Sequence, residues 1–474
     1  MSWKIPEPLH EYIKKTHNVS QLESIYVSIS RKPFVLIQGP PGTGKTQTIL
    51  GLLSAILHAT PSRMLSNFGA VAIAVSFIPV EQKRNGSTAD KQKLGGTGKD
   101  KDSIRSAILD EAVIVCSTLS FSGSSLLGKL NHGFDIVIID DAAQAIKPAT
   151  LAPLVTGCKQ VGDPAQLPAT VISKVAKRFG YDTSLFKRLQ RAGYLVKMLK
   201  IQYRMHPQIR SFPSKDFYDE ALEDGSGVED YTTRDWHKYG CFGPFCFFDI
   251  EGVEESRTNK NEVEFVLLLY HKLVNMYPEL KSSSQIAIMS PYSGQVKEFQ
   301  ERFKKNFGAE SQKVVDITTV DGCQGREKDV VIILLSCVRA NQAKGIGLAN
   351  QDKGGIGFLK DNRRMNVAIT RAKSSVLVVG SASKLWNGNK HWRNLIKSAE
   401  NRGCLFKVSE PYDSFFREKN LGSLKVKAEE AQAAERDDPR DNENMAVYVN
   451  TGDADDNEYG RWGLSGSQLC RCRR

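Results

Sequence analysis

The sequence predicts an α/β protein with two domains, each built on a parallel sheet whose two faces are covered by helices. Short apolar runs alternate along the chain with helical stretches such as Thr46 to His58 and Asn261 to Tyr277. Strands buried on both faces have this continuously apolar pattern. The runs are FVLIQ, AVIVCS, DIVIID, QIAIMS, DVVIILLS and SSVLVVG. One set lies before residue 200 and a second runs from about residue 285 to 380, so we expect two sheets.

Length and composition fit this division. At 474 residues the chain is too long for one hydrophobic core, and 41% of its residues are hydrophobic. No apolar run reaches the roughly 18 residues of a membrane helix, and the N-terminal MSWKIPEPLH lacks the layout of a signal peptide. The nine cysteines include no CxxC pair, which favours reduced thiols over a zinc site or disulfides. We therefore expect a soluble intracellular protein without a membrane partner.

Charge is unevenly distributed along the chain. The net charge is +12, yet residues 421–474 hold eight basic and eleven acidic side chains, which leaves +15 for residues 1–420. A body of this charge suits a polyanion such as nucleic acid. Many basic proteins simply have solvated lysine faces, so charge alone leaves both interpretations open.

Three stretches look poor in core-forming residues. Residues 81–105 are charged and glycine-bearing, which indicates a mobile surface loop, and residues 340–357 form another glycine-rich loop. Apolar residues become sparse near the C-terminus. The expected organisation is a first domain over 1–200, a second over 201–412 and a disordered tail over 413–474.

Residues 39–46, GPPGTGKT, have the GxxxxGK[ST] form of a phosphate-binding loop and directly follow the apolar run FVLIQ. Glycines let the backbone fold into a nest of N–H donors, Lys45 can reach the β- and γ-phosphates, and Thr46 can hold magnesium. A strand leading into this loop makes a chance glycine-rich turn improbable and indicates a nucleoside triphosphate. The expected binding residues are Gly42, Thr43, Gly44, Lys45 and Thr46.

A pair of acids supplies the second half of this site. DIVIIDDAAQA ends a strand with Asp140 and Asp141. Asp140 would hold the magnesium with Thr46, while its neighbour polarises the attacking water. Paired acids at a strand end can also form a simple turn, so the assignment depends on the phosphate loop.

Further motifs follow in a fixed order. They are VGDPAQLPAT at 161–170, QYRMHPQI at 202–209, TVDGCQGREKD at 319–329 and NRRMNVAITRAK at 362–373. With the loop and the acidic pair they resemble the motifs of superfamily 1 helicases, and FPSKDFYDEALEDG and STLSFSGS are similar to the senataxin-like branch. The resemblance runs from residue 18 to about 386. It implies two RecA-like P-loop domains of AAA type, ATP and Mg2+ as cofactors, single-stranded RNA or DNA as partner, and a nuclear location.

The resemblance also implies roles around the nucleoside. Gln21 matches the glutamine that reads the adenine edge, Tyr203 the aromatic residue that stacks on the base, and Glu327 an acid near the ribose. From the residues alone, Tyr203 could equally be a half-buried core tyrosine.

Three matches concern the phosphates. Gln166 matches the sensor of the γ-phosphate, and Arg204 and Arg371 match two arginines that neutralise charge on the transferring phosphoryl group. A planar, permanently charged fork suits this work, although most arginines are surface cations. The expected catalytic residues are Lys45, Asp140, Asp141, Gln166, Arg204 and Arg371.

The chain departs from the family pattern in three places. Asp141 stands where the family has Glu, and retracting the carboxylate by roughly 1 Å is expected to slow hydrolysis by about a hundredfold. Residues 59–80 lack motif Ia, an APSN-type segment with its strand that grips nucleic acid, and leave no room for the family's inserted barrel. CKQVGDPAQLP lacks the apolar residues of a central strand, which predicts a shortened strand there.

Two functions follow from these observations. The first is an ATP-dependent RNA or RNA–DNA helicase, in which hydrolysis drives translocation on a single strand. The alternative is an ATP-binding nucleic-acid clamp with weak or no hydrolysis and unwinding, as expected if Asp141 and the absent motif Ia dominate. A GTPase or kinase is disfavoured because it has no use for the later motifs.

Overall fold

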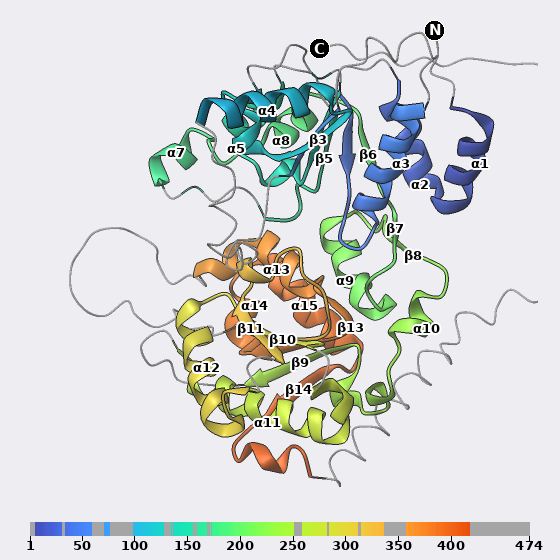
Figure 1. Cartoon of the computed structure of the whole chain (residues 1–474). Coiled ribbons are helices and arrows are strands. Elements are labelled where there is room, and N and C mark those ends of the chain that lie inside the picture. The colour runs from blue at the N-terminus through green and yellow to red at the C-terminus, as the bar shows by residue number, and fades with distance from the viewer. Residues whose placement is uncertain are drawn as a thin grey trace, which may run out of the picture. The chain divides into compact units, whose positions relative to one another are not determined.

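A computed structural model gives the architecture of the chain (Figure 1). It describes residues 5–30, 34–58, 71–75, 98–127, 134, 136–154, 159–167, 171, 173–250, 258–281, 284–310, 314–335 and 357–417. Two six-stranded sheets carry the fold, and both belong to one compact unit of the chain. No helix within these ranges is long and apolar enough to cross a membrane.

The first sheet is parallel throughout and has the strand order β3-β2-β4-β5-β1-β6. Its strands are β1 (Leu36–Gln38), β2 (Val71–Val75), β3 (Ile114–Thr118), β4 (Ile136–Asp140), β5 (Lys159–Gly162) and β6 (Val196–Met198). The helices of this part are α1 (Glu7–Thr16), α2 (Val19–Ser28), α3 (Lys45–His58), α4 (Gly98–Glu111), α5 (Leu119–Ser122), α6 (Lys147–Leu154), α7 (Lys174–Arg178) and α8 (Leu185–Arg191).

Alternate residues of β1 and β4 point to opposite faces of this sheet, as strand geometry requires. Ile37 and Ile138 join one apolar cluster together with residues of α1, α2 and α3. Leu36 and Val137 join a second cluster together with Phe186 of α8. Both faces are therefore covered, which confirms the predicted α/β class and explains the continuously apolar strand sequences.

Two local expectations for this half are wrong, and one is confirmed. The interval 59–80 does contain a strand, because β2 pairs with β3 and β4. The strand expected to be shortened is β5, which has four residues between β4 and β1 and pairs with β4 at only two of them. Residues 98–105 lie in α4 and not in a loop, while the rest of the expected loop, 81–97, lies outside the described residues.

The second sheet is also parallel and has the order β11-β10-β12-β13-β9-β14. Its strands are β9 (Phe245–Ile250), β10 (Ile286–Ser290), β11 (Val315–Thr319), β12 (Lys328–Leu334), β13 (Ala372–Gly380) and β14 (Leu405–Val408). Its helices are α9 (Pro207–Phe217), α10 (Val228–Thr232), α11 (Lys260–Met276), α12 (Ser293–Phe307), α13 (Asn362–Ile369), α14 (Ala382–Trp386) and α15 (Lys390–Asn401). A separate short pair joins β7 (Ile201–Gln202) to β8 (Glu223–Asp224).

Two apolar clusters cover the faces of the second sheet. Val376 and Val378 of β13 pack in one cluster with residues of α9, α13, α14 and α15. The intervening Leu377 and Val379 pack in the other cluster with residues of α11 and α12. Because β9 belongs to this sheet, its strands begin about 40 residues earlier than the expected start near 285.

Residues on both sides of the boundary between the expected second domain and the expected tail pack against this sheet. Tyr412 and Phe416 are buried in the cluster that contains α11, and the Phe416 ring stacks on Phe265 with 5.5 Å between ring centroids. Aromatic burial of this size stabilises the segment. The expectation of disorder from residue 413 is therefore wrong up to residue 417, and residues 418–474 lie outside the described part, as does most of the expected loop at 340–357.

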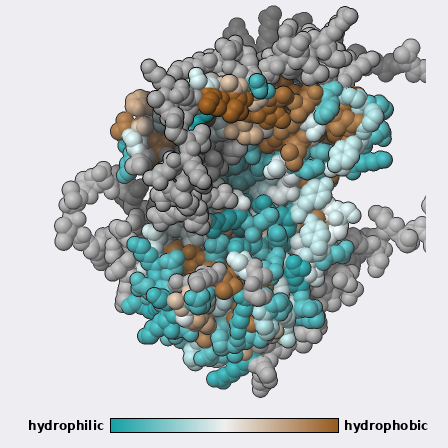
Figure 2. Space-filling view, viewed as in Figure 1, coloured by the Kyte–Doolittle hydropathy of each residue, from teal (hydrophilic) through white to brown (hydrophobic). Residues whose placement is uncertain are grey.

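The surface of the two halves differs in polarity. Figure 2 shows hydrophobic side chains gathered over the part that carries α4 and β3, and mainly hydrophilic ones over the part that carries the second sheet. The exposed large hydrophobic residues of α4, β3 and their neighbourhood are Ile104, Ile108, Val113, Ile114 and Phe121.

Two neighbouring histidines lie where α9 begins. The rings of His206 and His237 meet edge to face with 5.5 Å between centroids. His206 is the N-cap residue of α9, where its Nδ1 accepts a hydrogen bond from the backbone N–H of Gln208. His237 bonds through Nε2 to the hydroxyl of Ser375 on β13. Burial lowers the pKa of each histidine to about 4, and the charge of Asp224 opposes this at His206.

These pKa values predict acid lability. A histidine in the unfolded chain has a pKa of about 6.5. Below that pH the unfolded chain therefore binds protons that the folded chain does not bind. The stability is fully present above pH 6.5 and is lost as the pH falls towards 4. We expect His206→Asn, which keeps a cap acceptor, to reduce the pH slope of the free energy of unfolding by up to about 1.4 kcal/mol per pH unit.

Urea unfolding at several pH values between 4 and 7 measures this slope. The exposed His271 of α11 provides the control, because His271→Asn should keep the slope of the wild type. Identical slopes for His206→Asn and the wild type would contradict the assignment.

Candidate functional site

The phosphate-binding loop connects β1 to α3, as the sequence predicts. Gly42 and Gly44 both have a φ of 76°, in the left-handed region that favours glycine. A Cβ atom on Gly39 would lie 2.2 Å from Cγ of Lys45, and one on Gly42 would lie 2.7 Å from Cβ of Arg204. The loop is therefore a cradle of bare backbone that opens onto the first turn of α3, where helix N–H groups and the helix dipole favour an anion.

Lys45 lies at the centre of the loop. Its Nζ donates a hydrogen bond to the carbonyl oxygen of Gly39 at 2.8 Å. Burial lowers the pKa of Lys45 below its ordinary value, and the charges of Asp141, Asp163 and Asp140 oppose this shift. The structure thus brings the lysine together with the acids that follow β4 and β5, although they are about 100 residues apart in sequence.

The two acids lie at the carboxyl end of β4. Asp140 is the last residue of the strand, and its Oδ1 accepts a hydrogen bond from the backbone N–H of Asp141 at 2.9 Å. Burial and the neighbouring Asp141 raise the pKa of Asp140 above its ordinary value. Asp141 has a φ of 50°, where Asp and Asn are several times more frequent than other side chains. The residue that departs from the family pattern therefore suits its own backbone conformation.

The oxygen groups of the expected metal site are those that a divalent metal would take. Thr46 is the second residue of α3, which follows β1, and Asp140 is the last residue of β4 in the same sheet as β1. A hydroxyl and a carboxylate are oxygen ligands of the kind that Mg2+ takes beside phosphate oxygens. Only two protein ligands are expected, because magnesium keeps several waters.

Gln21 and Tyr203 lie against the loop. Gln21 of α2 is buried, and its Nε2 donates to the carbonyl oxygen of Thr43 at 3.1 Å. The backbone N–H of Tyr203 donates to the carbonyl oxygen of Gly42 at 2.9 Å, and its hydroxyl accepts from Asn18 at 3.1 Å. Tyr203 is 44% exposed, which excludes the alternative interpretation of this residue as a core tyrosine.

The two arginines are anchored from the side of the second sheet. Arg204 Nε donates to Glu327 Oε2 at 2.6 Å, and Arg204 Nη1 donates to the carbonyl oxygen of Thr370 at 3.2 Å. Arg371 is buried, and its Nε donates to the carbonyl oxygen of Val367 at 3.1 Å. Burial and the charge of Arg204 lower the pKa of Arg371 to about 10. Neither arginine is an ordinary surface cation.

Glu327 forms an ion pair with Arg204. Burial raises its pKa, but the charges of Arg204 and Lys373 outweigh burial, so the pKa of Glu327 lies below its ordinary value. A carboxylate that stays ionised holds the guanidinium in one orientation. The proposed contact of Glu327 with a ribose remains a prediction.

Gln166 lies in a buried polar network that the sequence did not reveal. Its Nε2 donates to Asp163 Oδ2 at 3.0 Å, and the hydroxyl of Tyr218 donates to the same oxygen at 2.8 Å. Asn366 Nδ2 donates to Tyr218 Oη at 2.8 Å. Asp163 lies three residues before Gln166 in the motif GDPAQ. This short spacing could have indicated that the two side chains are in contact. Tyr218 and Asn366 are too distant in sequence to give one.

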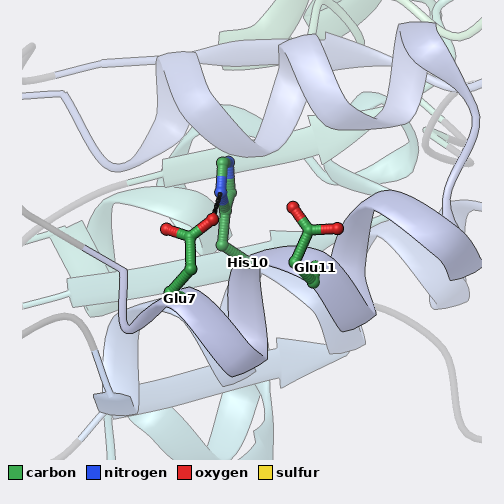
Figure 3. Close-up of side chains that lie close together, drawn as sticks. All are labelled: Glu7, His10 and Glu11. Carbon is green, nitrogen blue, oxygen red and sulfur yellow. Dashed lines mark ion pairs between the residues drawn. The ribbon is translucent and has the colours of Figure 1, made fainter.

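A group of two glutamates and one histidine on α1 is a candidate metal site. Among the described residues, Glu7, His10 and Glu11 on α1 are the group close enough together to share a metal (Figure 3). His10 Nδ1 lies 3.7 Å from Glu7 Oε1, and Glu11 pairs with Lys14 at 3.0 Å. Spacings of three and four residues on an exposed helix produce such contacts without a metal, so we treat the group as a solvated helix face.

The residues that match known protein families belong to both sheets. Residues 16–93 and 75–174 match one family described as an AAA domain, and residues 181–383 match a second with the same description. The chain is 51% identical to the probable helicase MAGATAMA 3 of Arabidopsis thaliana, over 90% of this chain and 65% of that protein. It is 36% identical to the probable helicase senataxin of Homo sapiens, over 68% of this chain and 12% of that protein.

The chain spans less than two thirds of the length of each of these relatives. The alignment with the Arabidopsis protein covers 546 positions, more than the 474 residues of this chain. That relative therefore has residues within the aligned span that this chain lacks. The solved structure of PRRSV helicase aligns with a TM-score of 0.36 and 14% identity over 88% of this chain and 70% of that chain.

The crowding at Gly42 predicts a loss of nucleotide binding in Gly42→Ala. The new Cβ strains the backbone by about 1–2 kcal/mol and would lie 2.7 Å from Cβ of Arg204. We expect the dissociation constant for ATP to rise at least about tenfold, because the loop and Arg204 must move apart.

Gly193 offers a matched control, because its φ is 86° and no atom lies within 4 Å of its ideal Cβ position. Gly193→Ala should lose similar stability and keep its affinity for ATP. Fluorescence titration with a labelled ATP analogue measures both variants, and equal affinities would show that the contact with Arg204 is unimportant.

Proposed function

The chain is a homologue of the senataxin-like helicases, and from this premise we propose that it is an ATP-dependent RNA or RNA–DNA helicase. Hydrolysis of ATP would drive movement along a single strand. The observation that carries the proposal is the meeting of the phosphate loop with Arg204, which is also bonded to Glu327 and to the Thr370 carbonyl. A nucleotide in the loop would therefore contact groups held by both sheets.

We propose that ATP binds with Mg2+ in this arrangement. Thr46 and Asp140 would hold the metal, which supplies charge neutralisation at the β- and γ-phosphates. Lys45 and the loop amides would bind the phosphates, and Gln21 and Tyr203 would bind the base. Support for the base site comes from the contacts of both residues with the loop backbone.

The charge-bearing side chains would act on the phosphoryl group in transfer. Gln166 would sense the γ-phosphate, and Arg204 and Arg371 would neutralise charge that develops on its oxygens. Asp141 would accept the hydrogen bond of the attacking water. Because both arginines are already fixed by carbonyl or carboxylate partners, little reorganisation would be needed as the charge develops.

Single-stranded nucleic acid is the proposed partner of the basic body. Residues 1–420 carry a net charge of +15, which would favour phosphate backbones and make binding sensitive to salt. If both sheets hold one strand, cycles of ATP binding and release would become steps along it. A nuclear role in transcript processing and in resolving RNA–DNA hybrids is proposed from the family.

A second function is favoured by one residue. Asp141 is one methylene shorter than the glutamate of the family, and the structure gives it a left-handed backbone conformation. If this geometry holds the carboxylate too far from the water, the protein would bind ATP and hold nucleic acid without turnover. It would then act as an ATP-gated clamp.

Steady-state ATP hydrolysis with and without single-stranded RNA tests the first function. We expect hydrolysis that RNA stimulates and that Lys45→Ala abolishes, because the variant loses the ammonium group bonded within the loop. The exposed Lys177 of α7 supplies a control substitution to Ala that should keep the activity. ATP binding without hydrolysis would refute the motor and favour the clamp.

Substitution of Asp141 separates the two functions. Asp141→Glu advances the carboxylate by roughly 1 Å, and we expect hydrolysis to rise by about tenfold to a hundredfold if the rest of the site is competent. Asp141→Asn keeps the shape and removes the charge, so it should abolish hydrolysis while ATP still binds. Rates that are the same in the wild type and in both variants would show that Asp141 does not act on the attacking water.

A further inference from the structure

A closed ring of hydrogen bonds joins the turn after β5 to α9 and α13. Asp163 Oδ1 accepts from the backbone N–H of Ala165 at 3.1 Å, and Asp163 Oδ2 accepts from Tyr218 Oη at 2.8 Å. Tyr218 Oη accepts from Asn366 Nδ2 at 2.8 Å. Asn366 Nδ2 also donates to the carbonyl oxygen of Ala165 at 3.0 Å, which closes the ring.

The ring is buried and has strict geometric requirements. Asp163 and Tyr218 are each 2% exposed, and Asn366 is fully buried. A buried carboxylate is costly unless donors satisfy it, and here Tyr218, Gln166 and a backbone N–H surround it. Asn366 Nδ2 donates to both of its acceptors in the ring, whereas Asn366 Oδ1 has no hydrogen-bond partner among the described residues. Displacement of Tyr218 or Asn366 would leave further buried polar atoms without their bonds.

One side of the ring holds the expected phosphate sensor. Gln166 Nε2 donates to Asp163 Oδ2, the oxygen that also accepts from Tyr218. A carboxylate oxygen can accept two such donors, so Gln166 and Tyr218 are bonded to the same atom. The orientation of the Gln166 amide therefore depends on the position of Tyr218.

The other side of the ring holds an arginine of the expected site. The carbonyl oxygen of Asn366 accepts from the hydroxyl of Thr370 at 2.7 Å. That hydroxyl oxygen accepts from Arg371 Nη2 at 3.2 Å, and Arg371 Nε bonds to the next carbonyl of α13, that of Val367. Arg371, which lies two residues after α13, is therefore bonded to the end of this helix, and Asn366 fixes the same helix to the turn that carries Gln166.

We propose that Tyr218 and Asn366 are positioning residues that align Gln166 with Arg371 for phosphoryl transfer. They act through Asp163 and through α13 and do not touch the nucleotide. The inference deepens the proposed function and rests on it, since alignment matters only if the site hydrolyses ATP. It assigns a task to FYDEALEDG, a segment that no part of the proposed nucleotide site uses.

A purely structural ring would behave differently. If the ring only stabilised the fold, its loss would lower the thermal stability and would reduce ATP affinity and turnover together. A positioning role lowers the turnover number and spares nucleotide affinity, because Lys45 and the loop backbone bind ATP without the ring. The split between kcat and KM therefore distinguishes the two roles.

Tyr218→Phe in the full chain is the sharpest test, because it removes one hydroxyl and leaves the ring volume. We expect kcat for RNA-stimulated ATP hydrolysis to fall about tenfold to a hundredfold, while KM for ATP stays within about twofold. Tyr270→Phe, the same change at a buried tyrosine of α11, is the matched control and should keep both constants. Thermal unfolding of each variant confirms that the assay temperature lies below the transition.

Asn366→Ala provides an independent break in the ring. If the ring acts as a unit, the double variant of Tyr218→Phe and Asn366→Ala should lose little more activity than the more damaging single variant. Losses that multiply would show two separate effects and would overturn the proposal.

Two other results would also overturn it. The first is a Tyr218→Phe protein that hydrolyses ATP at the rate of the wild type, and the second is a parallel loss of kcat, ATP affinity and thermal stability. A wild-type protein that hydrolyses no ATP would refute the proposed function itself, and this proposal with it. Measuring the wild type first therefore separates the two failures.

Discussion

The close approach of the phosphate loop to the segment that begins at Tyr203 is the constraint on which the rest of the site depends. The backbone N–H of Tyr203 is bonded to the carbonyl oxygen of Gly42, and the position of a Cβ on Gly42 is already taken by Arg204. A side chain at Gly42 would push the arginine away from Glu327. Glycine at this position therefore serves two purposes: it lets the backbone turn with positive φ, and it lets a group anchored on the second sheet reach the loop.

Buried charge is the second constraint on this region. Burial lowers the pKa of Lys45 and of Arg371 and raises the pKa of Asp163. In each case burial favours the neutral form of the group. Such groups are retained only when opposite charges or donors compensate for the lost water. Asp163 acts on Lys45, and Arg371 bonds to the carbonyl oxygen of Val367 in α13 and to the hydroxyl of Thr370. Removing one partner would leave another group buried without compensation, so the site and the fold around it are stabilised by the same contacts.

The sequence allowed the architecture and the nucleotide loop to be predicted, because both follow from local patterns. Runs such as DIVIID became strands. The expected helix at 46–58 begins one residue earlier and ends at the same residue, and the expected helix at 261–277 is shifted by one residue. The lack of an apolar run at Lys159–Gly162 correctly predicted a short strand, yet β5 still pairs with two neighbours. In this case the position in the sheet overrides the local preference. The ring of Asp163, Tyr218 and Asn366 could not be predicted, since its members meet only when both sheets have formed.

The arrangement of cations suggests how a bound anion would affect the site. Burial, and after it the charge of Arg204, lower the pKa of both Lys45 and Arg371, which means that Arg204 repels each of these cations before any ligand binds. Phosphate oxygens placed among them would replace this repulsion with attraction, and loss of the γ-phosphate would restore part of it. Because Lys45 is fixed to the loop while Arg204 and Arg371 are anchored from the second sheet, the change in repulsion would act between the two parts. The same charges that would stabilise transfer would then also loosen the site after it.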